Sequence, residues 1–104
     1  MAIDIEELKE IISILLKQFI KSGIKEVELN SDYYWMISPN ERENFTGENP
    51  PEPSVGSIID DIEHLKKLIA GNSLPTLVDI DRFANVLIAI SESISKSDIR
   101  FINQ

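Results

Sequence analysis

The sequence has no cysteine, a single histidine and only four glycines in 104 residues. The absence of cysteine excludes disulfides and thiolate metal ligands, and it suits a reducing compartment. The four glycines are scattered, so they form no phosphate-binding loop. There is also no cysteine nucleophile and no G-x-S-x-G motif. We therefore expect no cofactor and no metal, and the sequence favours a protein that is not an enzyme.

Basic residues are scarce. Ten lysines and arginines face eighteen aspartates and glutamates, which gives a net charge of −8. Nucleic-acid binding draws most of its strength from basic side chains at phosphates, so the composition predicts no nucleic-acid partner. The same acidity would steer a basic protein toward the chain, or it serves solubility alone.

No apolar run is long enough for a membrane span. The longest, from Ile11 to Ile20, is interrupted by polar residues, whereas a bilayer requires roughly 20 apolar residues. The first ten residues carry four acids and one lysine, unlike the basic start of a signal peptide. We therefore expect no membrane association and a cytoplasmic location.

The length predicts one domain over residues 1–104, and its first element is a helix over residues 3–22. Asp4 is a candidate N-cap and Gly23 a candidate C′ glycine. The apolar side covers more than half of the circumference, so we expect burial on more than one side, at the domain centre or in a subunit contact. The apolar stripe consists of Ile5, Leu8, Ile12, Leu15 and Phe19, widened by Ile11, Leu16 and Ile20.

The next segment changes to an alternating pattern and predicts a β-hairpin over residues 25–38. Val27 and Leu29 share one side of its first strand. Residues 30–32 are typical of a turn, and residues 33–37 are rich in aromatic and large apolar side chains that suit a second strand.

Residues 39–54 form a predicted acidic, proline-rich loop. Four of the five prolines lie in it, and its one large apolar residue is Phe45, a candidate contact to the core. A loop of this length is uncommon in a compact domain and is usually functional or disordered.

Two further helices are predicted over residues 57–70 and 76–95, with apolar residues at helical spacing and with Gly71 at the end of the first. The tail, residues 97–104, fits an edge strand or an extension of the last helix. The predicted fold is therefore α+β and predominantly α-helical, with three main helices and a small antiparallel β-hairpin.

His64 and the carboxylates beside it could bind a metal or take part in catalysis, but a simpler interpretation explains their positions. His64 lies one helical turn from Asp60 and Asp61, as in a metal pair, but no third ligand is evident and a surface histidine paired with a carboxylate suffices. Asp60 and Asp61 point about 100° apart, and their place in the first turn suits the helix dipole. We therefore predict no catalytic and no metal-binding residue.

Tyr33, Tyr34 and Trp35 place large side chains on both faces of the second predicted strand. Either both faces belong to the core, or one face is an aromatic patch of the kind that binds proteins.

The stretch Ile24–Ile37, which contains Asp32-Tyr-Tyr-Trp, and the later Ser57-Ile-Ile-Asp-Asp resemble a family of small, uncharacterised bacterial proteins built around an acidic residue followed by Tyr-Tyr-Trp. The resemblance covers about the middle third of the chain. It implies a bacterial cytoplasmic protein without an assigned activity, and it transfers no functional residues.

Three functions fit these observations. The first is a small acidic, non-enzymatic protein-interaction module of the adaptor, regulator or toxin-neutralising type, with a basic protein as partner. The second is a small-ligand or catalytic pocket between the hairpin and the helices, lined by Tyr33, Tyr34 and Trp35. The third is a structural homodimer through helix 3–22. The candidate partner-binding residues are Tyr33, Tyr34, Trp35, Glu41, Glu43, Phe45 and Glu48.

Overall fold

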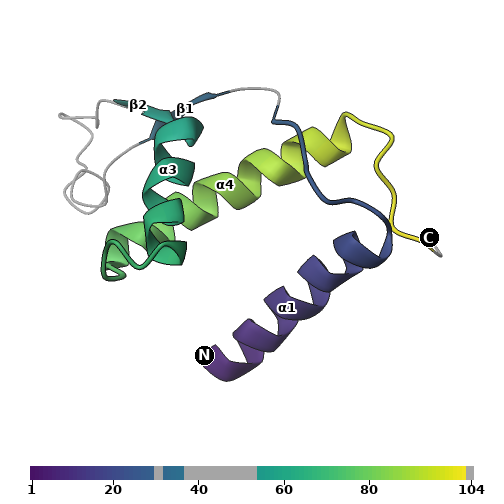
Figure 1. The fold of residues 1–104 in the computed structure, drawn as a ribbon, viewed down its shortest axis with the longest axis horizontal. Helices are drawn as coiled ribbons and strands as arrows, with labels where there is room; N and C mark the ends of the chain where they lie inside the picture. The colour runs from purple at the N-terminus through teal and green to yellow at the C-terminus, as the bar shows by residue number, and fades with distance from the viewer. Residues whose placement is uncertain (30–31, 37–53, 103–104) are drawn as a thin grey trace.

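The computed structural model describes residues 1–29, 32–36 and 54–102. Three helices and two short strands follow each other along the chain (Figure 1). The predominantly helical fold with three helices that the sequence predicts is confirmed. The predicted loop lies outside the described residues, except for its last one. The elements are α1 (Ile5–Lys21), β1 (Tyr33–Met36), β2 (Ser54–Ser57), α3 (Ile58–Ile69) and α4 (Leu77–Ser95).

The helix ends follow from local sequence chemistry. The Asp4 carboxylate accepts a hydrogen bond from the Glu7 backbone N–H at 3.1 Å and caps α1. Gly23 (φ 80°) and Gly71 (φ 73°) adopt the left-handed conformation just after α1 and α3. At each of these ends, two N–H groups beyond the helix bond to carbonyls of its last turn, which is the Schellman arrangement. Glycine therefore ends both helices where the sequence predicts.

The start of α4 is stabilised by Asp79. Its carboxylate accepts hydrogen bonds from the Thr76 backbone N–H at 2.9 Å and from Arg82 Nη1 at 2.7 Å. The Thr76 N–H and the Arg82 guanidinium hold the pKa of the Asp79 carboxyl below its usual value of 3.8. The ionised carboxylate therefore contributes to the stability of this helix end.

The predicted hairpin over residues 25–38 is wrong in its pairing. Residues 24–29 have no regular secondary structure, and β1 pairs instead with β2 in an antiparallel two-stranded sheet. Val27 and Leu29 are half-buried, as their alternation indicates. Alternation reports which side of an extended segment is covered, but it does not specify a hydrogen-bonding partner. The partner of β1 lies far along the chain, in the residues that lead directly into α3.

Asp32 joins β1 to α3. Its Oδ1 atom accepts hydrogen bonds from the Ser57 hydroxyl at 2.9 Å and from the Ile59 backbone N–H at 2.8 Å. Its backbone carbonyl accepts a third bond from the Ile58 N–H at 2.7 Å. Ser57 Oγ in turn accepts the Asp60 N–H at 3.3 Å. The residue before β1 therefore shares the capping of α3 with Ser57, which fixes strand and helix to each other.

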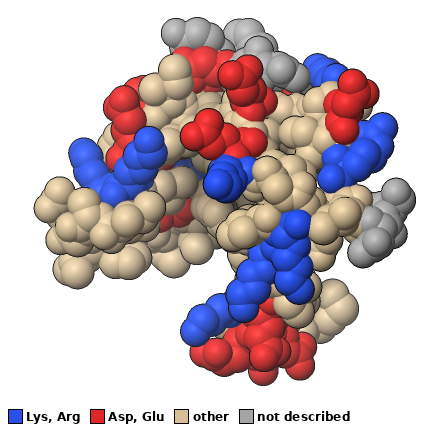
Figure 2. Space-filling model, turned by 45° about the vertical axis from the view of Figure 1, so that its right-hand side comes forward, with Lys and Arg blue, Asp and Glu red and all other residues tan. Residues whose placement is uncertain are grey.

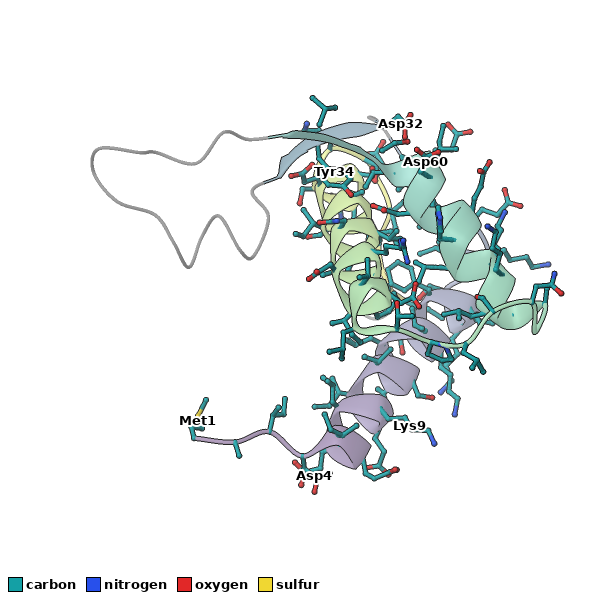
Figure 3. The ribbon with its side chains drawn as sticks, turned by 90° about the vertical axis from the view of Figure 1, so that its left-hand side faces the viewer. Met1, Asp4, Lys9, Asp32, Tyr34 and Asp60 are labelled. Atoms are coloured by element: carbon teal, nitrogen blue, oxygen red, sulfur yellow. The ribbon has the colours of Figure 1, made fainter. Side chains whose placement is uncertain are left out.

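The first helix is not central. α3 and α4 pack against each other, whereas α1 has no buried residue and its N-terminal half projects from the rest of the chain (Figures 1 and 3). In that half and at the middle of the helix, Ile5, Ile11 and Leu15 are 70%, 50% and 50% exposed. Among the described residues, Ile58 is the one buried apolar side chain, and it is still 4% exposed. The wide apolar side of α1 predicts burial on more than one side, but within one chain most of it stays exposed.

The C-terminal end of α1 is held by the tail of the chain. The Phe101 ring meets the Phe19 ring edge to face, with centroids 4.7 Å apart. Close by, Ser22 Oγ accepts a hydrogen bond from the Ile102 backbone N–H at 2.9 Å. Residues 98–101 have no regular secondary structure, so the described part of the tail is neither an edge strand nor a continuation of α4. The tail thus attaches α1 at its C-terminal end.

We expect Asp79→Asn to lower the free energy of unfolding at neutral pH and to lose this effect in acid. Because folding lowers the pKa of Asp79, its stabilising contribution is complete above 3.8 and is lost as the pH falls through the lower folded-state value. Urea unfolding followed by circular dichroism, from neutral pH to below 3.8, measures the difference from wild type. Asp81→Asn, at an exposed position of the same helix, is the matched control and should change less. A difference between wild type and Asp79→Asn that does not vary with pH would contradict this account.

Candidate functional site

The Tyr34 hydroxyl lies where β1, α3 and α4 meet. It donates a hydrogen bond to Asp61 Oδ2 at 2.5 Å and accepts one from Asn85 Nδ2 at 2.9 Å. Asp61 is buried, and Tyr34 and Asn85 are half-buried. Figure 3 shows Tyr34 close beneath the two strands. We call Tyr34, Asp61 and Asn85 the Tyr34 cluster.

The surroundings of Tyr34 keep its hydroxyl protonated. Burial, the hydrogen bond to Asp61 and the charge of Asp61 raise the pKa of Tyr34 from 10.0 to about 12, against smaller opposing effects of Asn85 and Arg82. At neutral pH such a tyrosine is a hydrogen-bond donor, and its pKa is far from that of an effective general base. The Tyr34 cluster is therefore suited to fixing three elements to one another.

Gly56 makes room for the Tyr34 ring. The two residues are paired across the sheet, and a Cβ atom at position 56 would overlap the ring and hydroxyl of Tyr34. Unlike Gly23 and Gly71, Gly56 has no positive φ. Glycine is therefore needed at this position for space and not for backbone conformation.

The predicted partner-binding residues fall into three groups. The Tyr34 hydroxyl is engaged within the Tyr34 cluster. The backbones of Tyr33 and Trp35 lie in β1, but their side chains are outside the described part of the structure. The remaining four predicted residues lie wholly outside it: Glu41, Glu43, Phe45 and Glu48.

Sequence reasoning missed Asp61 and Asn85. The helix dipole alone does not account for Asp61, because its side chain is buried and accepts the Tyr34 hydroxyl. The sequence did contain a sign that Asp61 is buried. Asp61 lies three residues after Ile58 and four before Leu65, at a position where helical spacing predicts an apolar residue. A polar residue at such a position requires a buried hydrogen-bond partner.

His64 takes no part in the cluster. Its Nδ1 donates a hydrogen bond to the backbone carbonyl of Asp60 at 2.8 Å, so its partner is a carbonyl and not the carboxylate expected from the sequence. Within the described ranges, no three His, Asp or Glu side chains gather in the manner of metal ligands.

A second feature is an apolar groove of about 380 Å³, which we call the α1–α4 groove. It lies between the C-terminal half of α1, the extended residues 24–29, α3 and α4. Two charged residues border it, Lys25 and Glu26, and both are exposed. Its apolar lining includes Leu16, Phe19 and Ile20 from α1, Val27 and Leu29 from the extended segment, Ile62 from α3, and Val86, Leu87 and Ile90 from α4.

The α1–α4 groove is not the pocket predicted between the hairpin and the helices. Tyr34 is not among its lining residues, and the side chains of Tyr33 and Trp35 lie outside the described part of the structure. The Tyr34 hydroxyl and the Asp61 carboxylate do converge, but they bond to each other. The residues of α1 that line the groove all lie in its C-terminal half.

Comparison of the chain with protein-family models, curated proteins and solved structures gives no match. The resemblance to a bacterial family therefore stays a prediction. No helix in the described part of the chain is both long and apolar enough to cross a bilayer. The Tyr34 cluster and the α1–α4 groove are the two features of the described residues that bear on function.

We expect Tyr34 to ionise near pH 12 in the folded protein. Subtracting the tyrosinate absorbance titration of Tyr34→Phe from that of wild type isolates this step, which should be centred at about 12 and not at 10.0. Because folding raises the pKa, the stabilising contribution of the hydroxyl is complete below 10.0 and is lost as the pH rises through about 12. Circular dichroism at each pH establishes that the chain is folded. A step near 10 in the folded protein would mean that the Tyr34 cluster does not form.

We expect Gly56→Ala to destabilise the protein by about 1–3 kcal/mol, because the added methyl group overlaps the Tyr34 ring. The same substitution in a Tyr34→Ala background should cost far less, since the ring is gone. Urea unfolding of wild type, both single variants and the double variant measures this coupling. Equal costs of Gly56→Ala in the two backgrounds would disprove the steric explanation.

Proposed function

We propose that this protein is a non-enzymatic protein-interaction module that binds an amphipathic helix of another chain in the α1–α4 groove. The observation that carries the proposal is the groove itself, whose lining is apolar apart from Lys25 and Glu26. Proteins commonly recognise partner helices by laying the apolar face of the helix into such a groove.

Exposed apolar side chains beside the groove support a macromolecular partner. Ile20 lines the groove and is 68% exposed, and Leu87 on the opposite wall is 39% exposed. Large exposed apolar patches on soluble proteins mark sites of interaction. A partner helix would cover both walls at once and remove this surface from water.

A small-molecule ligand fits the groove less well. The volume of about 380 Å³ lies in the range of ligand pockets. Such pockets, however, orient their ligands through a few firmly placed polar groups. The charged residues here are Lys25 and Glu26, whose side chains are exposed and not enclosed in the groove.

The charge of the chain selects among protein partners. A net charge of −8 favours a basic partner and accelerates its association at low salt. The segment with Trp35, Glu41, Glu43, Phe45 and Glu48 remains a predicted second contact region for such a partner. An adaptor, regulator or toxin-neutralising protein would use both regions, the groove for affinity and the acidic segment for steering.

Two matched variants of α1 test the groove. Ile20 and Ile14 are isoleucines of the same helix with nearly equal exposure, 68% and 66%, but only Ile20 lines the groove. Glutamine is a good helix former, so Ile20→Gln and Ile14→Gln should both fold. We expect Ile20→Gln to weaken binding of the partner at least tenfold, whereas Ile14→Gln leaves it unchanged.

The measurement begins with affinity capture from cells that make the protein, followed by calorimetric titration of the purified partner with each variant. The double variant Trp35→Ala/Phe45→Ala examines the second predicted region in the same assay. Equal affinities of Ile20→Gln and wild type for every reconstituted partner would refute the groove as the binding site. Loss of binding only in Trp35→Ala/Phe45→Ala would place the site in the acidic segment instead.

A further inference from the structure

Six large apolar side chains of α1 are exposed: Ile5, Ile11, Ile14, Leu15, Leu16 and Ile20. Its apolar stripe is fixed at one end, where Phe19 meets Phe101, and is open at the other, where Ile5 is 70% exposed. Figures 1 and 3 show the N-terminal half extending beyond the body formed by α3 and α4. This half is an amphipathic helix of the type that the α1–α4 groove would accept.

We propose that the helix bound in the α1–α4 groove is α1 of a second copy of this chain, so that two α1 helices pair antiparallel about a two-fold axis. Each copy then places the projecting half of its α1 in the groove of the other. This inference rests on the proposed function of the groove and replaces the basic partner with a second copy of the chain. A symmetric interface of this kind uses the same surface on both copies and closes after two.

Exposed apolar surface for such a dimer lies along α1. Ile5 and Leu15 on the apolar stripe are 70% and 50% exposed. In a single copy these side chains remain in contact with water. A second α1 would cover them and remove this apolar surface from water.

The spacing of the apolar residues favours a helical partner. Ile5, Leu8, Ile12, Leu15 and Phe19 alternate steps of three and four residues, which is the spacing that lets two helices pack side by side along a continuous line. The widening residues Ile11 and Leu16 flank this line and are 50% and 47% exposed. The stripe can therefore contact α1 of the second copy while keeping its own contacts near α4.

Charge selects the antiparallel orientation. Residues 4–10 carry four acids and one lysine, and residues 17–25 carry three lysines and no acid. An antiparallel pair places the acidic half of each helix beside the basic half of the other, whereas a parallel pair places like charges together. Figure 2 shows acidic side chains gathered at the projecting lower end of the molecule, with basic side chains above them. The helix dipoles also oppose each other in the antiparallel pair, which is the favourable arrangement.

Light scattering coupled to size-exclusion chromatography tests the dimer directly. Wild type should elute with twice the chain mass of 11.8 kDa. The double variant Ile11→Gln/Leu15→Gln should become monomeric, or dissociate at least tenfold more readily, and circular dichroism should show its helices retained. Ile14→Gln lies on the other side of α1 and should remain dimeric. A wild-type monomer at high concentration, or a dimer that survives Ile11→Gln/Leu15→Gln, would overturn the inference.

Cross-linking decides the orientation, and the absence of native cysteine makes each introduced thiol unique. Ile5→Cys and Leu16→Cys are separated by about 16 Å along one helix, so only an antiparallel pair brings them together between copies. An equimolar mixture of the two variants treated with a short bismaleimide should give the mixed dimer. A cross-linked dimer from Ile5→Cys alone would indicate a parallel pair and refute the proposed arrangement.

The outcomes separate this inference from the proposed function. A monomeric wild type whose groove still binds a different purified protein, with loss of binding in Ile20→Gln, refutes the dimer and supports the module. A monomeric wild type without any groove-dependent partner refutes both. A dimer that Ile20→Gln and Ile11→Gln/Leu15→Gln both weaken, while Ile14→Gln does not, supports both.

Discussion

The Tyr34 hydroxyl is the point through which β1, α3 and α4 constrain one another. Its two hydrogen bonds reach Asp61 and Asn85, which are far from it and from each other in sequence. A two-stranded sheet is marginal by itself, and Ile58 is the one buried apolar side chain in the described ranges. Directional polar contacts therefore set the geometry of this part of the chain. Asp32 adds a second set of contacts of the same kind between β1 and the first turn of α3.

Apolar contacts and polar contacts have separate places in this fold. The contacts of Tyr34 and Asp32 lie at the N-terminal end of α3, whereas exposed apolar side chains lie on α1 and along the α1–α4 groove. A buried polar group that loses its partner costs free energy, so the Tyr34 cluster favours one arrangement of α3 and α4. Exposed apolar surface gains free energy when any complementary surface covers it. The first region is thus specific within the chain, and the second remains available to other chains.

Helices were predictable because their signals are local. Asp4, Gly23 and Gly71 mark helix ends by chemistry that acts within one turn, and the structure places them where expected. Strand pairing was not predictable in this way, because the residues that bond to β1 are distant in sequence. The Tyr34 cluster was missed for the same reason. The one sign of the cluster in the sequence was Asp61, a polar residue at an apolar helical position. Its position in the first turn of the helix could also be explained by the helix dipole. The α1–α4 groove depends on where α1 lies, which periodicity does not determine.

The register of the small sheet has a consequence for how the protein can vary. Tyr33 pairs with Ser57 and Met36 with Ser54, so the chain leaves the sheet at Met36 and returns to it directly opposite. The pairing therefore brings the two ends of the connection together. The free-energy cost of closing a loop grows slowly with its length, by about 0.6 kcal/mol for each doubling. A change in length between residues 36 and 54 therefore changes this closure cost little, while Tyr34 and Gly56 hold the sheet against the helices.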